Sequence, residues 1–178
     1  MTDFTLHSVN TAPAAAKPLL ENAQKRIGFI PNLLAMMAEA PVTLEAYLTL
    51  NQLMAKSSFS GMEVQLLALA ISAENGCDYC IAAHGTTARQ QHQIPQTVID
   101  AIQKNQPLAD TKLNALVTFA RSVTVKRGYV DDHEVDAFLQ AGYNKAQVLE
   151  VITAIAMKTL SNYTNHIVKT PVDAQFSG

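Results

Sequence analysis

Cysteine is scarce in this sequence: the 178 residues contain two, too few for the disulfide scaffold of a small secreted domain. Charge is scarce as well, with 16% charged residues and a formal net charge of −2, so no electrostatic signal indicates nucleic acid or an anionic membrane surface. No apolar run approaches the roughly 18 residues of a membrane span. The first residues also lack the basic and apolar regions of a signal peptide. We therefore expect a cytoplasmic protein, with neither nucleic acid nor membrane among its partners.

The alternation of apolar and polar residues that marks β-strands is also lacking. Apolar residues nevertheless make up 48% of the chain and recur at helical spacing. We predict an all-α fold of about eight helices in a single domain, residues 1–178. Residues 1–12 and 172–178 lack this periodicity and are expected to be flexible ends. The low charge leaves apolar surface that would suit a homo-oligomer.

Both cysteines lie in one stretch, ENGCDYCIAAH, at residues 74–84. A nearly apolar helix is predicted before this stretch, and Asn-Gly separates the two. If a new helix begins near Cys77, then Cys80 and His84 stand four residues apart on one face, and Cys77 lies one turn below Cys80. The motif core, about residues 60–90, thus places the CxxC at the N-terminal end of a central helix.

Four kinds of site can contain such a pair. A zinc site needs four ligands, and only His84 is close in sequence. A c-type haem needs a histidine directly after the second cysteine, where Ile81 stands. Two buried structural cysteines remain an open alternative, although this leaves the helical spacing unexplained. We favour a dithiol redox centre without a metal, because the two sulfurs would lie within bonding reach and next to a base.

Dithiol chemistry assigns different roles to the two cysteines. Only a thiolate attacks, so one thiol has to lose its proton near neutral pH. His84, four residues after Cys80, is predicted to take that proton and to hold it as an imidazolium. The helix N-terminus would instead stabilise a thiolate at Cys77. The two arguments favour different sulfurs, and we take Cys80 as the attacking thiol and Cys77 as its resolving partner.

Three further residues are candidates for supporting roles. Glu74, three residues before the first cysteine, could orient His84 or balance its charge, or could simply complement the helix N-terminus. Glu63 is an alternative relay acid, but it also fits a capping box with Ser60. Tyr79, between the cysteines, could pass a proton or could pack in the core.

The pattern S-x-E-N-G-C-x-Y-C-x-x-A-H over residues 72–84 resembles the signature of the alkylhydroperoxidase D (AhpD)-like branch of the carboxymuconolactone decarboxylase family. The resemblance is strongest over residues 60–87, and segments 28–32 and 162–167 are similar to the peroxidase-related members. It implies an AhpD-like helical bundle, a homo-oligomer (trimer or hexamer) and no metal or organic cofactor. It further implies peroxide reduction by Cys77 and Cys80, with a relay of glutamate, histidine and water in which His84 is the histidine.

Two positions depart from the AhpD pattern. Gln65 stands where that pattern has a glutamate, about three turns before the first cysteine, so Glu63 and Glu74 are the available substitutes. Tyr79 stands where AhpD itself has a histidine. The decarboxylases that name the family typically lack the CxxC, so decarboxylation is not the expected activity.

We therefore predict an antioxidant enzyme, a thiol-dependent peroxidase or disulfide oxidoreductase. Its substrate is expected to be a hydroperoxide, and its reductant an external dithiol or a thioredoxin-like protein. Two alternatives remain open. One is a helical redox-sensing or interaction module without turnover. The other is a decarboxylase- or lactone-type enzyme that transfers protons with His84 and Glu74.

Overall fold

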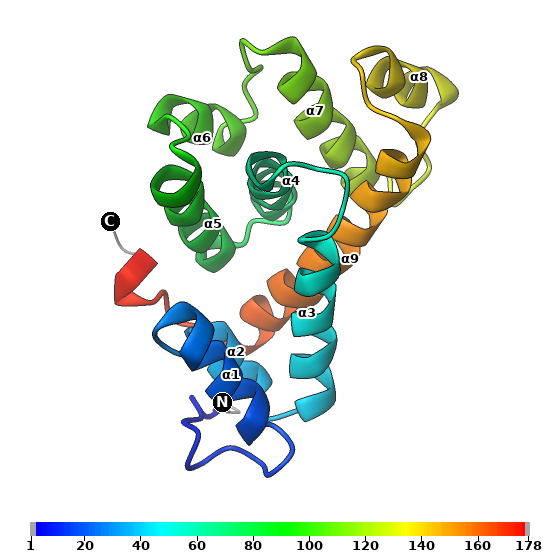
Figure 1. Cartoon of the computed structure of the whole chain (residues 1–178). Helices are drawn as coiled ribbons and strands as arrows, with labels where there is room; N and C mark the ends of the chain where they lie inside the picture. The colour runs from blue at the N-terminus through cyan, green and yellow to red at the C-terminus, as the bar shows by residue number, and fades with distance from the viewer. Residues whose placement is uncertain (1–2, 177–178) are drawn as a thin grey trace.

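The computed structural model describes residues 3–176 (Figure 1). Within this range the chain forms nine α-helices, one short 3-10 helix and no strand. The elements are α1 (Lys17–Ile27), α2 (Asn32–Met37), α3 (Pro41–Met54), α4 (Gly61–Glu74), α5 (Asp78–His92), α6 (Gln96–Gln103), α7 (Thr111–Val125), α8 (Asp132–Gln140), α9 (Lys145–Val168) and η1 (Ala174–Phe176). The predicted all-α fold is confirmed, with one helix more than the expected number of about eight.

Helix α4 lies at the centre of the fold and packs against α5, α6, α7 and α9 (Figure 1). The predicted capping box opens it, since Ser60 Oγ accepts a hydrogen bond from Glu63 N at 3.2 Å and Glu63 Oε2 accepts one from Ser60 N at 2.8 Å. All residues from Leu66 to Ser72 are buried. A helix that is apolar all round needs neighbours on every side, and this places α5 and its cysteines deep in the bundle.

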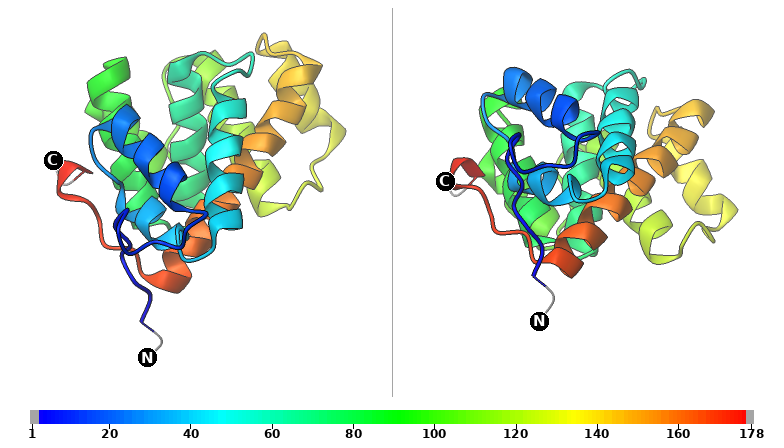
Figure 2. Two further views of the ribbon diagram at one scale, coloured as in Figure 1. Left: turned by 60° about the horizontal axis from the view of Figure 1, so that its bottom comes forward. Right: turned by 90° about the horizontal axis from the view of Figure 1, so that it is seen from below.

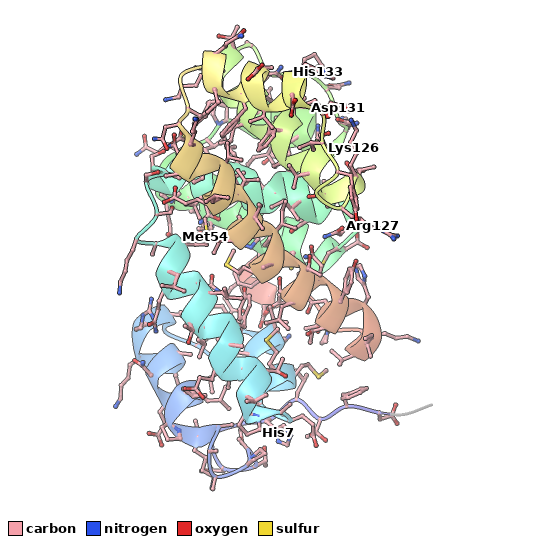
Figure 3. The ribbon with its side chains drawn as sticks, turned by 90° about the vertical axis from the view of Figure 1, so that its right-hand side faces the viewer. His7, Met54, Lys126, Arg127, Asp131 and His133 are labelled. Atoms are coloured by element: carbon pink, nitrogen blue, oxygen red, sulfur yellow. The ribbon has the colours of Figure 1, made fainter. Side chains whose placement is uncertain are left out.

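The first three helices form a layer that packs mainly through α2 and α3 against α9 (Figure 2). Met54, at the end of α3 beside α9, is 2% exposed (Figure 3). Helix α1 buries Leu20 and Ala23. This layer faces α5 across a cavity that is described below.

Helices α7, α8 and the start of α9 form the far end of the bundle. The rings of Phe119 and Phe138 stack at 4.6 Å between centroids, and those of Phe138 and Tyr143 at 4.4 Å. At the α7–α8 turn, Lys126 Nζ lies 3.2 Å from Asp131 Oδ2 (Figure 3). This end contains no part of the cysteine site.

Parts of the two end segments that were predicted to be flexible, 1–12 and 172–178, pack on the bundle. Ala12 is 5% exposed, and Asp173 is 6% exposed. The Asp173 carboxylate accepts a hydrogen bond of 2.6 Å from the hydroxyl of Tyr79. Individual polar contacts hold these segments, and such contacts leave no periodic signal in a sequence. The first two and the last two residues of the chain lie outside the described range.

Between residues 3 and 176, no helix combines the length and apolar character needed to cross a membrane.

Candidate active site: a cysteine pair beside a buried lysine

The turn between α4 and α5 sets the position of the first cysteine. Helix α4 ends in a pair of backbone hydrogen bonds, from Cys77 N to Ser72 O (2.9 Å) and from Gly76 N to Ala73 O (3.1 Å). Gly76 has a φ of +66°, a left-handed conformation in which a side chain would be strained. Cys77 then becomes the N-cap of α5, and Cys80 lies in its first turn.

The two cysteines are free thiols in contact with one another. Cys77 is 1% exposed and Cys80 is 2% exposed. Their side chains share a hydrogen bond. The amide Nδ2 of Asn165, on α9, lies 3.5 Å from Cys77 Sγ and 3.3 Å from Cys80 Sγ. The pair is therefore held between the first turn of α5, where its helical spacing places it, and the buried face of α9, which the spacing does not predict.

The ammonium group of Lys158 lies beside this pair. Lys158 comes from α9, is 0% exposed and hydrogen bonds to the sulfur of Cys80. The hydrogen bond from Cys77 and then the charge of Lys158 lower the pKa of Cys80 to about 5, against the cost of its burial. The same hydrogen bond and burial raise the pKa of Cys77. Cys80 is thus the more acidic thiol of the pair, and Cys77 is the thiol that keeps its proton to higher pH.

His84 lies against Lys158 and does not carry the predicted charge. Its Nδ1 is 2.9 Å from Gln65 Oε1, and its Nε2 is 2.8 Å from Lys158 Nζ. A carbonyl oxygen only accepts and an ammonium only donates, so the hydrogen is assigned to Nδ1 and Nε2 accepts from Lys158. Burial and the charge of Lys158 lower the pKa of His84 well below its usual range. The predicted imidazolium is therefore wrong: the ring is neutral, and Lys158 supplies the positive charge.

The two predicted relay acids lie away from His84. Glu74 Oε2 is 4.0 Å from Arg121 Nε, beside a second cavity between α4 and α7. Glu63 serves the capping box, and its Oε1 accepts a hydrogen bond of 3.0 Å from the Tyr143 hydroxyl. Both nitrogens of His84 have other partners. The expectation that Glu74 or Glu63 orients His84 is therefore wrong. Each carboxylate contacts other groups, Glu74 at the C-terminal end of α4 and Glu63 at its N-terminal end.

Tyr79 packs between the cysteine helix and the C-terminal segment. Its hydroxyl donates to Asp173 and accepts from the backbone N–H of Leu33 at 3.2 Å. Burial and the Asp173 carboxylate raise its pKa. Of the two roles considered for Tyr79, these contacts favour packing, since both hydrogen bonds lead away from the sulfurs.

Sequence reasoning missed Lys158, Ser161 and Asn165, which form the α9 side of the site. Cys80 Sγ lies 3.9 Å from Ser161 Oγ. These residues follow Val151 and Ala154 at steps of three or four, along the buried face of α9. The signal in the sequence is a lysine at a position that the helical spacing places on the buried face of α9. A fully buried cation is rare unless it is paired, so such a lysine indicates a nearby partner. Gln65 had been noticed only as a departure from the AhpD pattern, and it is the partner of His84.

No metal centre accompanies this constellation in residues 3–176, since no three His, Cys, Asp or Glu side chains there come together as a possible ion site. The zinc alternative therefore has no ligand set in this range.

A cavity of about 410 Å³ opens on the other side of His84. It lies between α1, α3 and α5, and His84 and Ala83 form part of its α5 wall. His84 thus lies between this cavity and Lys158, which contacts the Cys80 sulfur.

Solved structures share this fold over almost their whole length. An uncharacterized peroxidase-related protein from Ralstonia eutropha JMP134 with an alkylhydroperoxidase AhpD core is 20% identical (97% of this chain, 93% of that chain, TM-score 0.86). A peroxidase-related protein from Silicibacter sp. TM1040 is also 20% identical (99% and 93%, TM-score 0.84). A variant of the debrominase Bmp8 in complex with 2,3,4-tribromopyrrole is 18% identical (99% and 94%, TM-score 0.80). The fold is therefore that of an AhpD-like protein.

Residues 41–111, which include the cysteine pair and His84, match the model of the carboxymuconolactone decarboxylase family. This match confirms the resemblance to the family that was inferred from the CxxC motif. No curated protein is significantly similar to the chain in sequence.

Proposed function

We propose that this protein is a thiol-dependent peroxidase, a disulfide oxidoreductase that reduces hydroperoxides through Cys80 and Cys77. The observation that carries the proposal is the low pKa of Cys80, about 5, beside a second thiol one helical turn away. A thiolate at neutral pH is the nucleophile that peroxide reduction requires. The peroxidase-related names of two structures with this fold agree with this chemistry.

The proposed reaction begins with attack by the Cys80 thiolate on the terminal oxygen of ROOH. The O–O bond breaks, Cys80 becomes a sulfenic acid, and the leaving alkoxide takes a proton from the Lys158 ammonium to form ROH. The Cys77 thiol then condenses with the sulfenic acid and releases water, which leaves a disulfide within the first turn of α5. The peroxide is reduced by two electrons, and the two sulfurs are oxidised by two.

An external dithiol or a thioredoxin-like protein completes the cycle. Its thiolate attacks the disulfide, its second thiol resolves the mixed disulfide, and the two thiols of this chain are restored. One of the returning protons goes back to Lys158. Because Cys77 and Cys80 are almost fully buried, the reductant has to reach them from an opened form of the site. A cytoplasmic location, where such reductants are kept reduced, is part of the proposal.

A homo-oligomer, trimer or hexamer, is also proposed. Exposed apolar side chains on α9 support it, among them Leu149 (65% exposed) and Ile152 (50% exposed), which lie three residues apart on one face.

The test is a titration of the fully reduced protein with hydroperoxide. One equivalent is expected to remove both free thiols per chain and to form the Cys77–Cys80 disulfide, as read by thiol counting and mass spectrometry. With excess dithiothreitol, turnover is expected to continue. A Cys77→Ser/Cys80→Ser double variant is the control, and turnover that survives in it would favour the proton-transfer alternative. Disulfide formation with negligible turnover would favour the redox-sensing module.

A further inference from the structure

The cavity beside His84 is lined in part by aromatic rings. The chain has six Phe, five Tyr and no Trp. Three of these rings, Tyr47, Tyr79 and Phe176, come from α3, α5 and η1 to line this one space. Tyr79 and Phe176 meet edge to face, with centroids 6.1 Å apart and planes at 89°. Aromatic rings prefer such offset and edge contacts with other rings, so the lining suits an aromatic guest.

The volume and the charges of the cavity limit what it can bind. About 410 Å³ lies within the range of small-molecule sites and exceeds what a peroxide group alone would occupy. Leu33, Leu34 and Leu48 supply apolar walls. The two formally charged side chains in the lining, Arg26 and Glu45, have opposite signs, so neither an anion nor a cation is favoured overall. Neutral polar groups, such as the side chains of Asn22 and Gln52, are available for one hydroxyl or carbonyl of a ligand.

The C-terminal segment provides one wall of this cavity and is tied to the cysteine helix. Asp173 accepts hydrogen bonds from the Tyr79 hydroxyl at 2.6 Å and from the backbone N–H of Asn32 at 3.1 Å. The backbone oxygen of Phe176 accepts from Thr86 Oγ1 at 3.4 Å, and the Phe176 ring contacts Phe29 at 5.8 Å. These contacts hold the segment beside α5 and the start of α2. The right-hand ribbon view of Figure 2 shows η1 next to α5.

We propose that this cavity binds an uncharged aromatic molecule of one or two rings, closed in by Phe176, and presents its reactive end to the cysteine pair past His84. The inference rests on the proposed function only for the role of the ligand, which would be an arylalkyl hydroperoxide or its alcohol product. Binding itself requires no redox chemistry.

The experiment is a fluorescence titration with 2-naphthol, a phenol that is uncharged at neutral pH. The absence of Trp keeps the protein background low. Saturable binding is expected for the reduced protein and for Cys80→Ser. Retained binding in Cys80→Ser would show that binding does not depend on the thiolate, whereas saturable binding to a wild-type protein that shows no hydroperoxide turnover would contradict the peroxidase alone.

Three variants test whether 2-naphthol binds in this cavity. Ala23→Phe, on the α1 wall, is expected to fill the space and weaken binding by at least about tenfold. Ala46→Phe is the matched control, since Ala46 is exposed on α3 and lies outside the cavity lining; it should change the affinity by less than about twofold. Phe176→Ala removes a wall of the cavity instead of filling it, and it should also weaken binding. This variant therefore tests the site even if Ala23→Phe fails to fold.

Three results would overturn the inference. The first is the absence of saturable 2-naphthol binding to the wild-type protein. The second is equal weakening by Ala23→Phe and Ala46→Phe. The third is binding of cyclohexanol or of 2-naphthoate as tight as that of 2-naphthol, since these compounds lack the aromatic ring and the neutral charge respectively.

Discussion

Hydroperoxide turnover is expected to fall by about a thousandfold or more when Cys80 is replaced by serine. The hydroxyl of serine stays protonated at neutral pH and is a poor nucleophile, so the first step of the proposed cycle has no attacking atom. The measurement is hydroperoxide consumption in the presence of excess dithiol.

Cys77→Ser is the matched comparison, because it removes the other thiol of the same pair. Its Cys80 is expected to consume one equivalent of peroxide and then to accumulate as sulfenic acid, which dimedone traps. A sulfenic acid that forms in Cys80→Ser and not in Cys77→Ser would reverse the two roles and contradict the assignment of the thiolate.

Replacing Lys158 by methionine is expected to move the pKa of Cys80 upward from about 5. The reason is that the thiolate loses the adjacent charge of Lys158, while the hydrogen bond from Cys77 remains. For a group whose pKa is lowered, the thiolate is present above that pKa and disappears as the pH falls through it. A higher pKa therefore moves this loss to higher pH. The rate of alkylation by iodoacetamide at pH 6 is expected to fall at least about tenfold.

Lys145→Met is the control for this change, since Lys145 is an exposed lysine at the start of the same helix. Stability gives a second readout. Because Lys158→Met removes one partner of a buried charge pair and leaves His84 Nε2 without its donor, we expect the free energy of unfolding at neutral pH to fall. An alkylation profile that is unchanged from pH 4 to 9 would show that Lys158 does not stabilise the thiolate.

The cysteine side of the site could be predicted from the sequence because it is local. The turn at Gly76, the start of α5 and the spacing of Cys80 and His84 all follow from a few neighbouring residues. The fold class was equally accessible, since helical periodicity is strong and strand alternation is missing.

The α9 side could not be predicted in the same way, because it comes from residues more than seventy positions away. The positive charge of the site comes from Lys158 and not from His84. Burial and the nearby charge of Lys158 both disfavour a second charge on the His84 ring. Glu74 was chosen for its closeness in sequence, yet the end of α4 turns its carboxylate toward Arg121. The contacts of Asp173 in the C-terminal segment could not be predicted either, because single hydrogen bonds leave no pattern in the sequence.

The enclosure of Lys158 has an electrochemical consequence. In the reduced protein its charge is balanced by the Cys80 thiolate, whereas a disulfide carries no charge and, in the proposed cycle, lies beside a lysine that has given up its proton, so the stabilising ion pair belongs to the reduced state. The dithiol state is thereby favoured over the disulfide, which raises the reduction potential of the pair, by about 30 mV for each tenfold of preference. Equilibration with glutathione buffers is expected to give a less negative potential for the wild type than for Lys158→Met. A disulfide poised in this way is readily reduced by ordinary cellular dithiols, so a buried cation would favour rapid return to the reduced enzyme.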